Sequence, residues 1–293
     1  MIYLKQAIFC GRSQDESSKE FVFWNGFAER ENMRITDKKI DGGKSFDWGK
    51  TSSDYAKYRD IYPPEFYKKI LNRGLCIHGQ CVLDIGTGTG VLPRNMYRHG
   101  ARWVGTDISE NQIAYARMLS LGMDIEYHAI PAEQLDFPDH SFDVVTACQC
   151  FWYFDHEKMI PELYRMLKPN GRILVLYMAW LPQEDRIAHE SEKLVLKYSP
   201  AWSGAGETMH PIWIPDCYEG RFELVYHEEY PLDVQFTRES WNGRMKACRG
   251  VGASLSLEEI ISWEQAHKKL LSEIAPEKFS VRHYGAIAEL RKI

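Results

Sequence analysis

Alternating glycines follow an apolar run in the segment 82–90, whose sequence is VLDIGTGTG. The apolar residues predict a short buried strand, and glycine lets the chain turn tightly and bring bare backbone against a ligand. Asp107 stands about 20 residues further on, at the end of a second predicted strand. A carboxylate at that place can accept hydrogen bonds from both hydroxyls of a ribose. The pattern therefore predicts a crevice that binds a nucleoside-containing cofactor.

The spacing of the glycines distinguishes between cofactors. A dinucleotide fingerprint needs a third glycine three residues after Gly88, and that position is Val91. Asp84 stands two residues before the first glycine; its carboxylate suits a ligand that carries an ammonium and a sulfonium and would repel a pyrophosphate. The segment therefore disfavours a nicotinamide-dependent oxidoreductase. A turn whose glycines serve packing alone is the remaining alternative.

From about residue 45 to residue 177 the chain resembles the class I S-adenosylmethionine-dependent methyltransferases. It is most similar to the small-molecule branch called type 11, which includes ubiquinone/menaquinone-pathway and trans-aconitate methyltransferases. Beside the glycine segment and GTD at 105–107, the matching segments are AEQLDFPD at 132–139, SFDVVT at 141–146 and LYRMLKPNGRIL at 163–174. The resemblance implies S-adenosyl-L-methionine as cofactor, S-adenosyl-L-homocysteine as product, and an enzyme that methylates a small molecule the sequence does not identify.

The resemblance also implies a set of cofactor-binding residues. Backbone at Gly86 and Gly88 faces the methionine half, Asp84 lies near its ammonium, and Asp107 binds the ribose. Many relatives carry Gly-Asp before the Ala-Glu beside the adenine, whereas this chain has Ile-Pro at 130–131, which favours backbone contacts there. The other residues expected at the cofactor are Tyr58, Arg59, Thr87, Gly90, Ile108, Ala132, Glu133 and Gln149.

Tyr58 and Arg59 belong to the segment 53–62, SDYAKYRDIY, which is similar to a family segment that lies over the cofactor. In that segment a tyrosine and an arginine approach the methionine carboxylate, and Arg59 would form a charge-assisted pair there. A surface salt bridge is the alternative interpretation of Arg59.

On the acceptor side we expect Gln149, Trp152, Tyr153 and Arg249. Relatives usually carry His then Trp where this chain has Trp152 then Tyr153, so the obvious candidate base is missing. The aromatic residues either favour the sulfonium through cation–π attraction or pack in the core. We therefore expect an acceptor that is already nucleophilic at neutral pH. A cofactor-binding protein without turnover is the alternative.

Further polar groups follow in the C-terminal part of the chain. Beside Arg249, the polar groups able to meet an anionic acceptor are Arg244, Lys246 and His210; a solvated charged surface is the other interpretation of each.

The elements that position these residues follow from periodicity and punctuation. Strands alternate with helices from residue 80 to 177, which predicts a parallel sheet covered on both faces. Helices are expected from Pro63-Pro64 to Gly74, from Val91 to His99, from the capping box Ser109-x-x-Gln112 to Leu121, and from Ser256-x-x-Glu259 to Ile274. Residues 178–221 place tryptophans among prolines and glycines and predict a lid, and strands are expected at 222–230 and 279–290.

By resemblance the fold is α/β, a Rossmann-like doubly wound and mostly parallel sheet of seven strands. The expected order is 3-2-1-4-5-7-6, with the last strand antiparallel and with helical lid elaborations. We expect an N-terminal extension at 1–43, the cofactor-binding core at 44–178, and at 179–293 a lid or substrate region with the C-terminal strands that complete the same sheet.

Composition sets further expectations. A formal net charge of −5 and a pI near 6.1 argue against a nucleic-acid partner, which needs a basic face. The seven cysteines lack paired C-x-x-C spacing, which favours reduced thiols and no metal site. With no long apolar run and no apolar leader, we expect a cytoplasmic protein without a membrane partner. The oligomeric state does not follow from the sequence.

Overall fold

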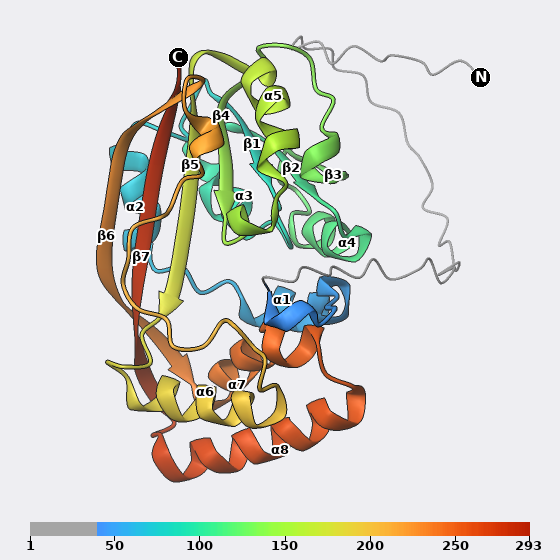
Figure 1. Ribbon diagram of the computed structural model, residues 1–293, viewed down its shortest axis with the longest axis vertical. Coiled ribbons are helices and arrows are strands. Elements are labelled where there is room, and N and C mark those ends of the chain that lie inside the picture. The colour runs from blue at the N-terminus through green and yellow to red at the C-terminus, as the bar shows by residue number, and fades with distance from the viewer. Residues whose placement is uncertain (1–39) are drawn as a thin grey trace, which may run out of the picture. The chain divides into compact units, whose positions relative to one another are not determined.

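The computed structural model describes residues 40–293 and is built on a sheet with strand order β3-β2-β1-β4-β5-β7-β6 (Figure 1). The strands β1 to β5 pair in parallel, and β7 is antiparallel to both β5 and β6. The fold class, the strand order and the antiparallel last strand are therefore confirmed. The strands are β1 (Cys81–Ile85), β2 (Arg102–Asp107), β3 (Ile125–Ala129), β4 (Phe142–Cys148), β5 (Leu167–Trp180), β6 (Phe222–Thr237) and β7 (Lys278–Lys292).

Eight α-helices are present in the described residues. They are α1 (Ser52–Tyr58), α2 (Pro64–Asn72), α3 (Val91–Met96), α4 (Glu110–Leu119), α5 (His156–Met166), α6 (Arg186–Tyr198), α7 (Arg238–Lys246) and α8 (Leu257–Ile274). Of the expected N-terminal extension, residues 1–43, positions 1–39 lie outside the described residues.

The side chains of neighbouring strand positions enter two different hydrophobic clusters, because successive residues of a strand point to opposite faces. Val82 and Val144 pack on one face together with Phe66 of α2 and Leu92 of α3. The adjacent strand residues Leu83 and Val145 pack on the other face, where α5 contributes Met159, Ile160 and Leu163. Both faces of the sheet are thus covered by helices, as the alternation of strands and helices predicts.

Most of the expected helix ends are present. Gly100, with φ of 84°, follows the short turn that extends α3, and Pro64 begins α2. Ser256 and Glu259 form the reciprocal capping box of α8. At α4 the expected box is only half formed: the Ser109 hydroxyl accepts from the backbone N–H of Gln112, while the Gln112 amide donates to the carbonyl of Trp48 at 3.3 Å.

The region after residue 177 is more regular than its sequence suggests. The strand β5 continues to Trp180, so the expected boundary at residue 178 falls inside it. Residues 178–221, which the sequence predicts as a lid, contain the regular helix α6, capped by the Asp185 carboxylate, which accepts from the Ala188 N–H at 2.9 Å. The prolines at 182 and 200 flank this helix and do not interrupt it.

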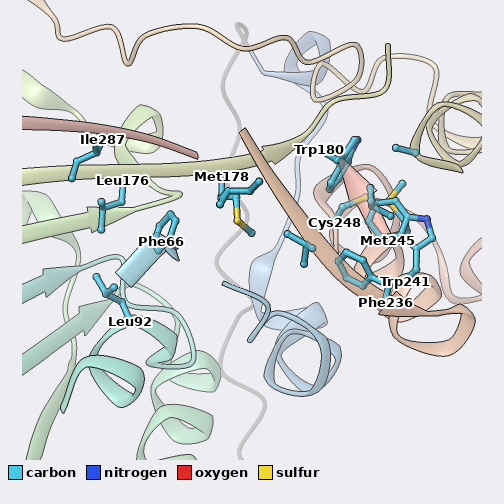
Figure 2. Close-up of a cluster of buried hydrophobic side chains, with 14 of the residues drawn as sticks. Phe66, Leu92, Leu176, Met178, Trp180, Phe236, Trp241, Met245, Cys248 and Ile287 are labelled. Atoms are coloured by element: carbon cyan, nitrogen blue, oxygen red, sulfur yellow. The ribbon is translucent and has the colours of Figure 1, made fainter. Parts of the chain in front are cut away.

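One of the two clusters continues from the sheet into the helices α6 to α8. Figure 2 shows Phe66, Leu92, Leu176 and Ile287 at one end of this cluster, and Trp180, Trp241, Met245 and Cys248 at the other. Figure 1 shows α6, α7 and α8 grouped near the end of β5, away from β1 to β4. The end of β5 therefore joins the sheet to these helices.

Between residues 40 and 293, no helix is long and apolar enough to cross a membrane.

Candidate functional site

A cavity of about 950 Å³ opens at the carboxyl ends of β1 to β5. The order of the sheet reverses between β1 and β4, and in open α/β sheets ligands bind at such a switch point. The volume lies near the upper end of the range for ligand cavities. The cavity is lined by residues from four loops that follow strands, from the segment around α1, and from residues 202–217 and 244–249.

The glycine turn forms one wall of this cavity. Gly86 and Gly88 both have positive φ, at 62° and 57°, and both line it. A Cβ at Gly88 would be 3.8 Å from the ring of Tyr55, so Gly88 presents open backbone. Gly90 differs, because its missing side chain makes room for the hydroxyl of Tyr127 and it is not part of the wall. The structure therefore places the first two expected glycines at the cavity and the third in a packing contact.

Asp84 holds this turn from inside the protein. Its carboxylate accepts hydrogen bonds from the hydroxyls of Thr87 and Thr146, both at 2.6 Å. Burial raises the pKa of Asp84 to about 6. Asp84 and Thr87 do not line the main cavity; they border a narrow recess that shares Arg59, Gly86 and Gly88 with it.

Asp107 lies at the cavity wall and positions the turn. One carboxylate oxygen accepts from the backbone N–H of Gly88 at 2.9 Å, and the other accepts from that of Ser109 at 2.8 Å. Each oxygen keeps a further lone pair for a ligand donor. Burial raises the pKa of Asp107, because it penalises the charged form.

Next to Asp107 the cavity wall is mostly apolar. Ile108, Ile130, Pro131 and Ala132 line it, together with Glu133. The Glu133 carboxylate accepts from the backbone N–H of Asp155 at 2.9 Å and so ties this wall to the loop after β4.

Gln112 is a wall residue that sequence reasoning missed. The sequence predicts it only as a helix-capping residue, yet it lines the cavity, and its side-chain oxygen is buried without a hydrogen-bond partner. A Cβ at Gly88 would be 3.9 Å from this oxygen, so a buried acceptor faces the glycine turn. The signal available in the sequence was its spacing from Ser109, which marks the first turn of a helix that follows β2.

The segment around α1 contributes a tyrosine and an arginine, as the resemblance implies, but the tyrosine is a different one. Arg59 donates to the hydroxyl of Tyr55 at 2.8 Å and lies over its ring, and both residues line the cavity. Tyr58 instead donates to Glu239 at 3.1 Å and is not part of the wall. The placement therefore does not support the cofactor role expected for Tyr58.

The loop after β4 brings the expected acceptor-side residues together. Gln149 adopts a φ of 69° and donates to the carbonyl of Met178 at 2.6 Å. Trp152 and Tyr153 also line the cavity. The Tyr153 hydroxyl accepts from Arg249 at 2.6 Å, and Arg249 forms an ion pair with Asp41 at 2.7 Å. The guanidinium of Arg249 is thus already neutralised by this chain.

The other three polar residues expected in this region differ in their partners. Lys246 pairs with Asp54 at 3.1 Å, and His210 pairs with Glu207 at 2.8 Å; neither lines the cavity. Arg244 does line it and is only 5% exposed, and two of its guanidinium nitrogens have no hydrogen-bond partner. Burial lowers the pKa of Arg244 to about 9.

Glu207 is a second wall residue that the sequence did not indicate. Its carboxylate accepts hydrogen bonds from the hydroxyls of Tyr177 at 3.0 Å and Tyr284 at 2.9 Å. It stands in an irregular segment between α6 and β6, where no periodic pattern could place it. The cavity therefore contains a carboxylate beside its aromatic residues.

No cluster of three or more histidine, cysteine, aspartate or glutamate residues that could hold a metal ion occurs from residue 40 onward.

Comparison with known proteins covers the part of the chain that carries the glycine turn. Residues 83–175 match the family described as "Methyltransferase domain". Two curated relatives, both named ubiquinone biosynthesis O-methyltransferase, come from Pseudomonas entomophila (strain L48) and Pseudomonas putida (strain W619). They are 31% and 30% identical over 158 residues, which is 52% of this chain and 67% of each relative.

Among solved structures, the chain is similar to Haemonchus contortus "Phospholethanolamine N-methyltransferase 2", which was determined with phosphomonomethylethanolamine and S-adenosylhomocysteine. The TM-score is 0.48 at 20% identity, and the match covers 83% of this chain and 57% of that one.

Proposed function

The chain belongs to the class I S-adenosylmethionine-dependent methyltransferases, and on that premise we propose that its cavity binds S-adenosylmethionine against the glycine turn and transfers the methyl group to a small-molecule acceptor. The observation that carries this proposal is the junction of Gly88 and Asp107, where open backbone and a half-buried carboxylate meet at 2.9 Å on the cavity wall. Gln112 adds an unpartnered acceptor at the same place. The hydroxyls of a ribose can donate hydrogen bonds to these acceptor oxygens.

The nucleoside half of the cofactor fits the wall formed after β2 and β3. Asp107 accepts from the ribose hydroxyls, and the side-chain oxygen of Gln112 is a further acceptor beside it. The apolar side chains of Ile108 and Ile130 cover the adenine ring, and the backbone of Ala132 and Glu133 meets its edge. The lining of the cavity supports this arrangement, since all of these residues border it.

The amino-acid half fits the recess beside the glycine turn. Arg59 and Asp84 border the same recess, so a guanidinium and a carboxylate face one small space. The methionine part of the cofactor carries both an ammonium and a carboxylate, and each of these charges then has an opposite partner. Arg59 binds the carboxylate, and Asp84 attracts the ammonium. Gly86 and Gly88 leave room for the chain between the nucleoside and this group.

The bound cofactor supplies a methyl group on a sulfonium, so the bond from sulfur to carbon breaks as the acceptor bonds to carbon, and the electron pair stays on the sulfur of S-adenosylhomocysteine. The chain contributes position and exclusion of water, which are the main sources of acceleration for such a displacement. Trp152 and Tyr153 line the cavity, where aromatic rings favour a nearby cation. Gln149, held to the Met178 carbonyl, orients the acceptor.

We further propose that the acceptor is nucleophilic at neutral pH and needs no general base. The His-Trp pair of the relatives is replaced by Trp152 and Tyr153, and the pKa of Tyr153 is raised by burial. The carboxylate of Glu207 is held by two tyrosine hydroxyls. A carboxylate, a thiolate or an unprotonated amine fits such a site.

The experiment is a methyl-transfer assay with a panel of small carboxylates, thiols, amines and phenols, followed by release of S-adenosylhomocysteine from pH 6 to 9. Turnover with one of the first three classes is expected. Turnover confined to phenols would refute the base-free mechanism. Tight cofactor binding without turnover on any acceptor would instead favour a binding protein.

A further inference from the structure

The guanidinium of Arg244 is a charged group of the cavity wall to which the proposed cofactor assigns no counterpart. The side chain comes from α7, is 5% exposed, and lies over the ring of Trp180 at 4.7 Å. Its Nε and Nη1 atoms are buried and donate to no protein acceptor within residues 40–293. It therefore presents hydrogen-bond donors, and a charge, that face the cavity without a ligand from this chain.

A buried charge without an opposite charge is unfavourable, and a guanidinium stays protonated inside proteins. The charges around Arg244 make this worse, because the guanidinium of Arg59 acts on it with the same sign. Its other neighbours include Cys248, whose pKa is raised to about 11 by burial, and Tyr62, whose pKa burial also raises. These groups are neutral at physiological pH, so none of them neutralises Arg244, whereas a bound anion would.

Arg244 and Arg59 differ in which spaces they line. Arg59 lines both the main cavity and the narrow recess with Asp84 and the glycine turn, whereas Arg244 lines the main cavity and not the recess. Trp180 and Trp202, which are each 6% exposed, also line the main cavity, together with Gly204. Arg244 therefore lies on a wall that carries two tryptophan rings, one of them directly beneath its guanidinium.

The aromatic wall is fixed in place by its neighbours. The indole N–H of Trp180 donates to Glu192 at 2.5 Å, and the backbone N–H of Gly206 donates to the other oxygen of the same carboxylate at 2.9 Å. A Cβ at Gly250 would be 2.6 Å from the ring of Trp202, so this ring lies directly on backbone. Figure 2 shows Trp180 beside Cys248 and Met245, at the end of the hydrophobic cluster. A preformed wall of this kind favours a rigid, flat ligand.

We propose that Arg244 binds a carboxylate of the methyl acceptor, and that the acceptor is an aromatic acid whose ring lies against Trp180 and Trp202. This inference rests on the proposed function, because it takes the glycine turn and Arg59 as the place of the cofactor. The neighbouring cations support a carboxylate over a phosphate dianion: Arg249 is paired with Asp41, and Lys246 with Asp54, so one guanidinium is left for one negative charge.

The test measures binding of matched acids and amides to the protein saturated with S-adenosylhomocysteine. The probes are benzoate, 4-hydroxybenzoate and indole-3-acetate, each beside its neutral carboxamide, in isothermal titration calorimetry. We expect at least one acid to bind tenfold or more tightly than its amide, as a hydrogen bond to a buried charge implies. Arg244→Gln should abolish this preference, and Arg244→Lys should retain part of it.

The control variant is Lys246→Gln. Lys246 lies on the same helix as Arg244 but does not line the cavity. This variant should keep the preference for the acid. The melting temperature of the free protein is a second readout: Arg244→Gln should leave it unchanged or raise it, because the variant removes an uncompensated buried charge. A purely structural arginine would lower it.

Three results would overturn the inference while leaving the proposed function standing. They are equal binding of every acid and its amide by the wild-type protein, a preference for the acid that survives Arg244→Gln, and a loss of S-adenosylhomocysteine affinity in Arg244→Gln, which would place Arg244 at the cofactor. Failure of the wild-type protein to bind S-adenosylhomocysteine is a different result and would refute the proposed function itself.

Discussion

Asp107→Asn is the substitution that most sharply separates cofactor binding from folding. The carboxylate accepts from two backbone N–H groups, at Gly88 and at Ser109, and in the proposed complex it also accepts from the ribose. The asparagine oxygen can replace only one of the two carboxylate oxygens as an acceptor. The NH₂ group takes the place of the other oxygen, so two hydrogen-bond donors then face each other. The variant therefore loses a backbone hydrogen bond and the charge that meets the ribose.

The expected magnitudes differ for the two losses. Hydrogen bonds to a charged group contribute about 1.5–3 kcal/mol, so the affinity for S-adenosylhomocysteine should fall roughly tenfold to hundredfold. The free energy of unfolding of the free protein should fall by about 1–3 kcal/mol, because a buried donor is left without its acceptor. Calorimetric titration measures the first quantity and urea denaturation the second.

Asp185 offers a matched control. Its carboxylate also accepts from two backbone N–H groups, those of Ala188 at 2.9 Å and Arg282 at 3.0 Å, but it does not line the cavity. Asp185→Asn should therefore destabilise the fold by a similar amount and leave the cofactor affinity unchanged. Equal cofactor affinity in Asp107→Asn and the wild-type protein would refute the argument, since the ribose would then be held elsewhere.

The remaining predictions concern the recess and the acceptor side. Burial raises the pKa of Asp84 to about 6, so its charge is lost as the pH falls through that value. The affinity of the wild-type protein for S-adenosylmethionine should therefore decrease from pH 8 to 5. In Asp84→Asn the affinity should be lower and should not change with pH, as calorimetry at each pH would show. Tyr55→Phe removes the hydroxyl that accepts from Arg59 at 2.8 Å and should weaken cofactor binding by about 0.5–1.5 kcal/mol, whereas Tyr58→Phe should not; the reverse order would restore Tyr58 to the site. Glu207→Gln should retain more than about a tenth of kcat with a carboxylate acceptor, because general bases contribute about a hundredfold or more, and a larger loss in steady-state assays would identify Glu207 as a base.

The free energy of unfolding of the free protein also depends on the titration of Asp84. A carboxylate paired in the folded state usually loses stabilisation as the pH falls, whereas Asp84 should gain it. Because the pKa of Asp84 is raised in the folded state, its protonation favours folding, so its contribution to stability increases as the pH falls from about 6 toward its ordinary value of 3.8. Asp84→Asn should remove this part of the pH dependence in urea denaturation.

The parts of the site that the sequence predicted are those fixed by backbone conformation over a few residues. The glycines at 86 and 88 need positive φ, and Asp107 ends a strand next to the turn, so local spacing is enough to place them. Resemblance to relatives also gave the strand order, which no local pattern determines. The same spacing could not show that Gly90 is required for packing against Tyr127, because that contact joins the start of α3 to the middle of β3.

The residues that were missed depend on contacts between segments far apart in the chain. Tyr55 and Tyr58 lie one turn apart on α1, and which of them faces the cavity depends on how α1 packs against α7 and α4. The sequence does not predict the bounds of α6, although no proline or glycine interrupts this helix, because prolines and glycines surround it on both sides. Glu207 and Arg244 reach the cavity only through the packing of the region after residue 180.

The central claim is that the cavity binds S-adenosylmethionine, and calorimetric titration of the wild-type protein with S-adenosylhomocysteine and, separately, with NAD⁺ tests it most directly. We expect one S-adenosylhomocysteine per chain, no heat of binding with NAD⁺, and a stabilisation of about 2.7 kcal/mol when the bound ligand is present at 100 times its Kd. Binding of NAD⁺ without binding of S-adenosylhomocysteine would contradict the account.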